Sequence, residues 1–150
     1  MEIERKYLVK TLPDNLSSFP CRFLEQGYLC TEPVVRVRQD NDKFELTYKS
    51  KGLMVREEYN LPLTKEAYEH LKSKADGRII TKKRYMIPLQ EYTIELDVFE
   101  GELAPLILAE VEFPSEEKAN AFVPPEWFGE DVTFSTQYHN SNLSNRKEAV

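Results

Sequence analysis

Charged and apolar residues alternate along several short segments of the chain. At the N-terminus, Glu2, Glu4 and Lys6 alternate with positions that include Ile3 and Tyr7. Because successive side chains of a β-strand point to opposite faces, the three charged residues would share one face of a strand. The pattern predicts eight strands, at about residues 2–9, 23–31, 34–39, 42–50, 54–61, 78–87, 91–99 and 107–113.

Helical segments are predicted in the longer gaps between these strands. Thr64 and Ser115 stand where N-cap residues would begin two helices, and an apolar stripe at helical spacing runs from Ala67 to Ala75. The predicted helices cover residues 12–19, 65–75 and 116–122, with a short helical turn at 124–129. These elements predict a mostly β fold of the α+β class. If its sheet closes into a barrel with the charged rows inside, the helices cover the apolar rows outside.

The charged rows are segregated by sign. Any single row fits the solvated face of an ordinary antiparallel sheet, which needs no ligand. Such a face would mix both signs with neutral polar residues, whereas here basic rows precede acidic rows late in the chain. The segregation favours a binding site. Its basic residues are Lys6, Arg36, Arg38, Lys49, Arg56, Lys82 and Arg84.

This basic set suits an anion with many oxygen atoms. Arginine binds phosphate through two parallel hydrogen bonds, and lysine acts as a mobile point charge, so a mixed set can hold a chain of phosphoryl groups. Acidic residues on the same face offer the hard oxygen ligands that Mg²⁺ or Mn²⁺ takes. They are Glu2, Glu4, Glu95, Asp97, Glu110 and Glu112. Internal salt bridging is the alternative that needs no ligand.

Composition limits the class of protein. A chain of 150 residues with 41% hydrophobic content predicts a single domain over residues 1–150. The net charge of -6 argues against a nucleic-acid partner held by bulk electrostatics. Cys21 and Cys30 are too few for a disulfide framework, which favours a reducing, cytoplasmic location. No apolar run reaches the roughly 18 residues of a membrane span, so no membrane partner is expected.

The chain resembles the CYTH superfamily, the triphosphate tunnel metalloenzymes, over nearly its whole length. The rows of charged residues follow the order and spacing typical of that superfamily. They include Glu2-Ile3-Glu4-Arg5-Lys6, Gln26-Gly27-Tyr28-Leu29, Val35-Arg36-Val37-Arg38, Lys49, Arg56-Glu57-Glu58, Lys82-Lys83-Arg84-Tyr85 and Ala109-Glu110-Val111-Glu112-Phe113. The resemblance implies a closed eight-stranded antiparallel β-barrel, a tunnel with a charged lumen and helices packed outside, which holds a triphosphate and a divalent metal.

The resemblance also implies roles for single residues. Lys6, Arg36, Arg38, Lys49, Arg56, Lys82 and Arg84 would bind phosphates, and Glu2, Glu4, Asp97, Glu110 and Glu112 would hold metal, directly or through water. Glu58 and Glu95 would orient the cations. Lys82 and Tyr28 would act in catalysis, by orienting or deprotonating the attacking water; packing in the barrel wall is an equal alternative for Tyr28. We expect neither His70 nor His139 to be catalytic.

One segment departs from the superfamily's pattern. Relatives often carry an acidic and a basic residue just before a Tyr-x-Asn sequence near the C-terminus, where this chain has Ser135 and Gln137. A metal-binding or lid role for this segment is therefore not implied.

Several functions fit these residues. The first is metal-dependent hydrolysis of inorganic tripolyphosphate to pyrophosphate and phosphate, because the chain is short and has no evident insertion for recognising a base. Thiamine triphosphatase and adenylate cyclase belong to the same superfamily. A non-catalytic module that binds polyphosphate or nucleotide is a further alternative, although it would gain little from two Glu-x-Glu rows. A structural barrel with balanced internal ion pairs, and assembly as a homodimer, also stay open.

Overall fold

The computed structural model describes residues 1–144 of the chain, and these form ten strands, three α-helices and three 3₁₀ helices. The strands are β1 (Glu2–Val9), β2 (Cys21–Thr31), β3 (Val34–Asp40), β4 (Lys43–Lys49), β5 (Val55–Arg56), β6 (Glu58–Pro62), β7 (Asp76–Leu89), β8 (Tyr92–Phe99), β9 (Ile107–Glu112) and β10 (Phe128–Asp131). The helices are α1 (Lys65–Lys72), α2 (Glu116–Ala121) and α3 (Asn140–Leu143), and the 3₁₀ helices are η1 (Leu16–Ser18), η2 (Gly101–Leu103) and η3 (Thr136–Tyr138).

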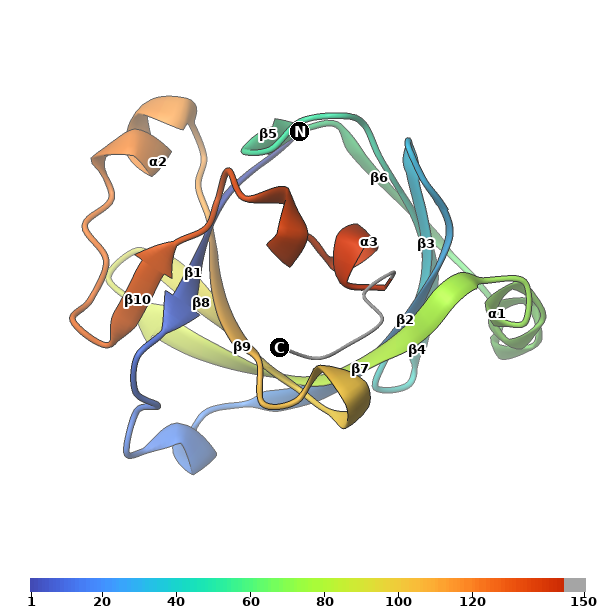
Figure 1. The fold of residues 1–150 in the computed structure, drawn as a ribbon, viewed down its shortest axis with the longest axis horizontal. Helices are drawn as coiled ribbons and strands as arrows, with labels where there is room; N and C mark the ends of the chain where they lie inside the picture. The colour runs from blue at the N-terminus through green and yellow to red at the C-terminus, as the bar shows by residue number, and fades with distance from the viewer. Residues whose placement is uncertain (145–150) are drawn as a thin grey trace.

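The strands form one antiparallel sheet that curls into a barrel (Figure 1). Their order is β10-β1-β9-β8-β7-β2-β3-β4-β6, and β5 pairs with β1. Since Glu57 alone separates β5 from β6, the pairing of Glu2 with Arg56 joins the two ends of the sheet. The barrel is therefore confirmed. The predicted strand 54–61 is divided into β5 and β6, and the strand count exceeds the predicted eight.

One strand was predicted as a helical turn. Residues 124–129 contribute a turn, with the Phe128 N–H donating to the Pro125 carbonyl, and then enter β10, which pairs with β1 outside the barrel. A Cβ on Gly129 would lie 3.3 Å from the backbone of Leu8, so glycine permits this close approach. The predicted helix at 12–19 is likewise shortened to η1.

The other predicted helices are confirmed, with their caps. The hydroxyl oxygens of Thr64 and Ser115 accept hydrogen bonds from the N–H groups of Ala67 and Lys118. In α1, Tyr68 is fully buried and its ring centroid lies 5.2 Å from that of Phe44. None of the helices within residues 1–144 is long and apolar enough to cross a membrane.

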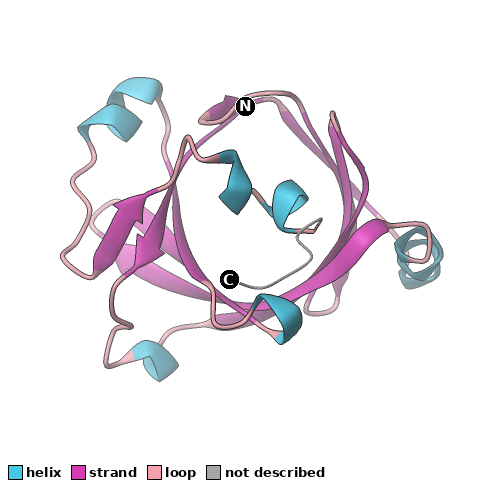
Figure 2. Ribbon diagram, in the orientation of Figure 1, coloured by secondary structure: helices cyan, strands magenta, loops and turns pink. Residues whose placement is uncertain are grey.

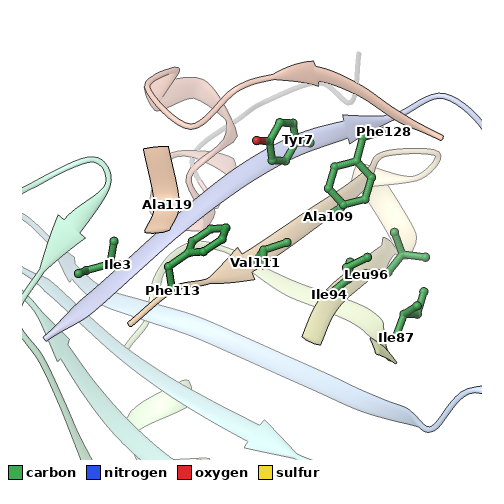
Figure 3. Packing of buried hydrophobic residues seen from close by; sticks show 10 residues of the cluster. All are labelled: Ile3, Tyr7, Ile87, Ile94, Leu96, Ala109, Val111, Phe113, Ala119 and Phe128. Atoms are coloured by element: carbon green, nitrogen blue, oxygen red, sulfur yellow. The ribbon is translucent and has the colours of Figure 1, made fainter. Parts of the chain in front are cut away.

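An apolar core covers the outer face of β1, β8 and β9. Figure 3 shows Tyr7 beside Phe128 of β10, and Ala119 of α2 above the strands. The ring centroids of Tyr7 and Phe128 lie 4.9 Å apart. These residues alternate along their strands with the predicted site residues, so covering one face by α2 and β10 turns the charged face inward.

A second apolar cluster fills one end of the barrel interior. Leu143 of α3 is fully buried and packs with residues on the inner faces of several strands, among them Tyr28, Val34, Ile80, Phe99 and Leu108. In the view down the barrel, η3 and α3 lie within the ring of strands (Figure 2). Neither η3 nor α3 is among the helices predicted to pack outside the barrel, and this segment lies inside it.

Candidate active site

The barrel interior holds a cavity of about 140 Å³ with charged walls. It is lined by most of the predicted site residues, namely Glu2, Glu4, Lys6, Tyr28, Arg36, Arg38, Lys49, Arg56, Glu58, Arg84, Glu95, Glu110 and Glu112. They come together because each occupies an inward position on its strand, two residues from the next. Lys82 and Asp97 do not line this cavity, although they share the same face of their strands.

Acidic residues meet where β1 lies beside β9. Glu4 is paired with Glu112, and Lys6 with Glu110. Burial, together with the charges of Glu110 and Glu2, raises the pKa of Glu4 well above its ordinary value. Burial and the charge of Glu95 also raise the pKa of Glu112. Like charges directly opposite each other on adjacent strands are destabilising, so these acids are not arranged for stability alone.

Glu2 and Glu58 share the ammonium group of Lys49. Lys49 Nζ lies 3.0 Å from Glu2 Oε1 and 3.4 Å from Glu58 Oε2. Burial raises the pKa of Glu2 to about 7 despite the opposing charge of Lys49. For Glu58 burial acts in the same direction, but a hydrogen bond with Glu2 and the charge of Lys49 lower its pKa to about 2. Glu2 is therefore the member of this pair that takes up a proton near neutral pH.

Three arginines point into the cavity without a carboxylate partner. Within residues 1–144, no ion pair is formed by Arg36, Arg38 or Arg56. Arg36 donates instead to the Thr47 hydroxyl at 3.2 Å. Burial and the charges of Arg36 and Arg84 lower the pKa of Arg38 to about 10. Buried cations are costly unless paired, so this side of the cavity is suited to an anion.

Lys82, Arg84 and Asp97 form a buried ionic cluster in the barrel wall. Arg84 donates from Nε and Nη2 to the two carboxylate oxygens of Asp97 at 2.7 and 2.9 Å. Lys82 Nζ lies 2.7 Å from Asp97 Oδ2, and the side chains of both are fully buried. Burial lowers the pKa of Lys82 to about 8, with Asp97 opposing the shift. Both oxygens of Asp97 are thus occupied by cations, and Lys82 forms no hydrogen bond with Tyr28.

The C-terminal segment supplies cavity residues that the sequence pattern did not indicate. His139 lies in the cavity wall next to Asn140 and Ser141. Arg56 Nη2 lies 3.0 Å from His139 Nδ1, and Lys6 Nζ donates to the Tyr138 carbonyl at 3.1 Å. Burial, then the charges of Lys6 and Arg56, lower the pKa of His139 to about 4. Neutral His139 can therefore accept a hydrogen bond from Arg56.

Strand alternation could have indicated two further cavity residues. Glu45 and Asn60 line the cavity. Glu45 lies two residues before Thr47 on β4, and Asn60 lies two residues after the inward Glu58 on β6. Asn60 Nδ2 donates to Glu58 Oε1 at 2.9 Å, and the Thr47 hydroxyl donates to Asn60 Oδ1 at 2.6 Å. These groups hold Glu58 and Arg36 in place.

The cavity carboxylates have the chemistry that a hard divalent cation requires. Within the described part of the chain, no group of three or more acidic, His or Cys residues is placed to hold a metal by itself. The carboxylate of Glu4 forms no hydrogen bond or ion pair in residues 1–144, and the negative charges of Glu110 and Glu2 beside it favour an added cation. Mg²⁺ commonly uses one or two carboxylates and completes its coordination with water and substrate phosphate. The residues present fit such a site.

Comparisons with known proteins give one consistent result. The CYTH domain model matches residues 1–148. An inorganic triphosphatase of Nitrosomonas europaea is 45% identical over 148 residues, covering 95% of this chain and 96% of that protein. One of Acetivibrio thermocellus is 39% identical over 148 residues, covering 95% and 92%. A crystal structure of an inorganic triphosphatase has a TM-score of 0.74 at 40% identity, covering 99% of this chain and 97% of that chain.

Proposed function

This chain belongs to the CYTH domain family, and we propose that it is a divalent-metal-dependent hydrolase that converts inorganic tripolyphosphate to pyrophosphate and phosphate. The observation that carries the proposal is the set of three cavity arginines, Arg36, Arg38 and Arg56, that have no carboxylate partner within residues 1–144. An enclosed anion with several oxygens would satisfy all three. The names of the two curated relatives support tripolyphosphate as that anion.

The cavity favours a phosphate chain over a nucleotide. Apart from Val34, its wall is made of charged and polar side chains, and among the described residues that line it the aromatic rings are those of Tyr28 and His139. Recognition of a base usually uses stacking on an aromatic or guanidinium face together with hydrogen bonds to the base edge. Here the guanidinium groups are directed into a site crowded with like charges, where phosphate oxygens are the better partners.

The cations on the two sides of the cavity would bind different phosphoryl groups of the substrate. Lys6 and Arg56 lie next to the C-terminal segment, whereas Arg36 and Arg38 project from β3. Groups fixed in this way can stabilise negative charge on the transferring phosphoryl group without reorganising. Lys6 and Arg56 would exchange the Tyr138 carbonyl and His139 Nδ1 for phosphate oxygens.

The acidic residues would hold Mg²⁺ or Mn²⁺ where β1 lies beside β9. We assign Glu2, Glu4, Glu110 and Glu112 to this role, with Glu58 and Glu95 as supporting residues. A bound divalent ion would neutralise phosphate charge and lower the pKa of a coordinated water. Asp97, a predicted ligand, does not line the cavity and has both oxygens in ion pairs, and we therefore assign it to the positioning of Arg84 and Lys82.

A phosphate-release assay tests the proposal. The protein should release phosphate from tripolyphosphate with Mg²⁺ or Mn²⁺, turn over ATP and thiamine triphosphate more slowly, and lose turnover when EDTA removes the metal. Arg36→Met should raise the KM for tripolyphosphate, whereas Lys83→Met, which removes an exposed cation from β7, should not. Cyclic AMP as the main product from ATP, or no turnover of any triphosphate, would overturn the proposal.

A further inference from the structure

Gln26 is a fully buried polar residue that contacts two of the cavity residues. It lies on β2, two residues before Tyr28, and is paired with Arg38 of β3. Its side chain does not line the cavity, so it has no direct access to substrate. A buried amide must be hydrogen-bonded to be tolerated, and the partners of Gln26 are the side chains of Arg38 and Tyr28.

The two hydrogen bonds fix the orientation of the Gln26 amide. Arg38 Nε donates to Gln26 Oε1 at 3.1 Å, and a guanidinium group can only donate. The oxygen of the amide must therefore face Arg38, and its NH₂ group must face Tyr28. Gln26 Nε2 donates to Tyr28 Oη at 3.3 Å. The alternative amide orientation would place two donors against each other at Arg38.

The direction of this hydrogen bond determines what the Tyr28 hydroxyl can do. Its oxygen accepts from Gln26, and Tyr28 Oη forms no other hydrogen bond within residues 1–144. The phenolic proton is then free to be donated, and Tyr28 lines the cavity. A protonated phenol held in this way offers its O–H to an oxygen of a bound phosphate chain.

We infer that Gln26 is a positioning residue that makes Tyr28 a hydrogen-bond donor to the triphosphate, in place of a base that deprotonates water. The inference rests on the proposed function, since it concerns the same cavity. It assigns a role to a residue outside the cavity and reverses the direction of proton donation expected for Tyr28. Such a donor stabilises charge that develops on phosphate oxygens in the transition state.

Two near-isosteric substitutions separate this inference from its alternatives. In Gln26→Glu, a carboxylate still accepts from Arg38 but also accepts the Tyr28 proton, which turns the hydroxyl away from substrate. In Gln26→Met, neither hydrogen bond is formed, and the hydroxyl can still rotate toward the cavity. We expect kcat for tripolyphosphate to fall by roughly 10- to 100-fold in Gln26→Glu and by less in Gln26→Met. If Tyr28 instead donated to Gln26, a glutamate would replace the amide well and Gln26→Met would be the slower variant; that order refutes the inference.

The same substitutions in a Tyr28→Phe background control for charge. A carboxylate at position 26 also repels the substrate and binds Arg38, and those effects persist without the hydroxyl. We therefore expect the kcat difference between Gln26→Glu and Gln26→Met to disappear in the Tyr28→Phe background, and any remaining effect to appear in KM. An unchanged kcat difference in that background would show that Gln26 does not act through Tyr28.

The pH profile distinguishes a donor from a base. A donor must stay protonated, so the ratio of wild-type to Tyr28→Phe kcat should be constant between about pH 6.5 and 8.5. A ratio that rises about tenfold per pH unit would show that tyrosinate is the active form and would overturn the inference. Failure of the proposed function is recognised separately, because the wild-type protein would then release no phosphate from tripolyphosphate.

Discussion

Replacing Asp97 by Asn tests whether this carboxylate holds cations together or binds metal. Asp97 and Lys82 have fully buried side chains, and only 6% of the Arg84 side chain is exposed. The substitution keeps the shape of the side chain and one oxygen for Arg84. It removes the carboxylate charge that lies 2.7 Å from both cations.

The expected cost follows from this burial. Removing one partner from a buried ion pair typically destabilises a protein by about 3–5 kcal/mol, because the remaining charge is left uncompensated. Burial already lowers the pKa of Lys82 to about 8, and Asp97 is the group that opposes the shift most strongly. Without Asp97, Lys82 would lose its proton near neutral pH, which limits the damage. We therefore expect a loss of about 3 kcal/mol, at the lower end of the range.

Urea unfolding in EDTA measures this loss in the absence of metal. Glu95→Gln is the matched control, because Glu95 also faces Arg84 but at 3.4 Å and with a side chain that is 28% exposed, so its loss should be under about 1 kcal/mol. If Asp97 were instead a metal ligand, Asp97→Asn would leave the EDTA stability within about 1 kcal/mol of wild type and would raise the Mg²⁺ concentration needed for turnover. That pair of results would refute the positioning role.

Two further predictions concern the cavity. Lys6→Met should lower kcat/KM for tripolyphosphate by roughly 10- to 100-fold, the value of a charge-assisted hydrogen bond, whereas Lys10→Met, at the exposed position just after β1, should stay within about twofold; equal effects in steady-state assays would contradict the site. His139 has a pKa lowered from 6.5 to about 4, so its contribution to stability is complete above pH 6.5 and is lost as the pH falls toward 4. Between pH 7 and 5, the free energy of unfolding in urea should fall by on the order of 2 kcal/mol more for wild type than for His139→Gln. The opposing titration of Glu2 occurs in both proteins and therefore cancels in this comparison. Parallel curves of unfolding free energy against pH would show that His139 is not held neutral.

Strand alternation predicted the barrel and most of the side chains that line its cavity. It could do so because the alternation of side chains between two faces is a local property of a strand. Glu2, Glu4 and Lys6 share a face whatever their partners are, and α2 and β10 decide which face turns inward. Alternation does not report depth along the barrel axis. Lys82 lies on the same face as Arg84, yet it lies outside the cavity wall with its ammonium group directed at Asp97.

The C-terminal segment could not be read from alternation at all. His139 reaches Arg56 across 83 positions of sequence, from a short segment with no strand or helix period. Its placement depends on Leu143, which fits among inner apolar residues of β2, β7, β8 and β9. In the sequence those residues look like interruptions of the charged rows. They form one apolar cluster only when the barrel places them together at one end.

Like charges in the cavity repel one another, and an anion and a cation added together would relieve this repulsion. On one side, burial and neighbouring acids raise the pKa values of Glu4 and Glu112; on the other, burial and neighbouring arginines lower the pKa of Arg38. Metal alone would relieve the acids but would be repelled by the arginines. A phosphate chain alone would relieve the arginines but would be repelled by the acids. A metal–triphosphate complex relieves both sides at once, so each component should bind more tightly when the other is present.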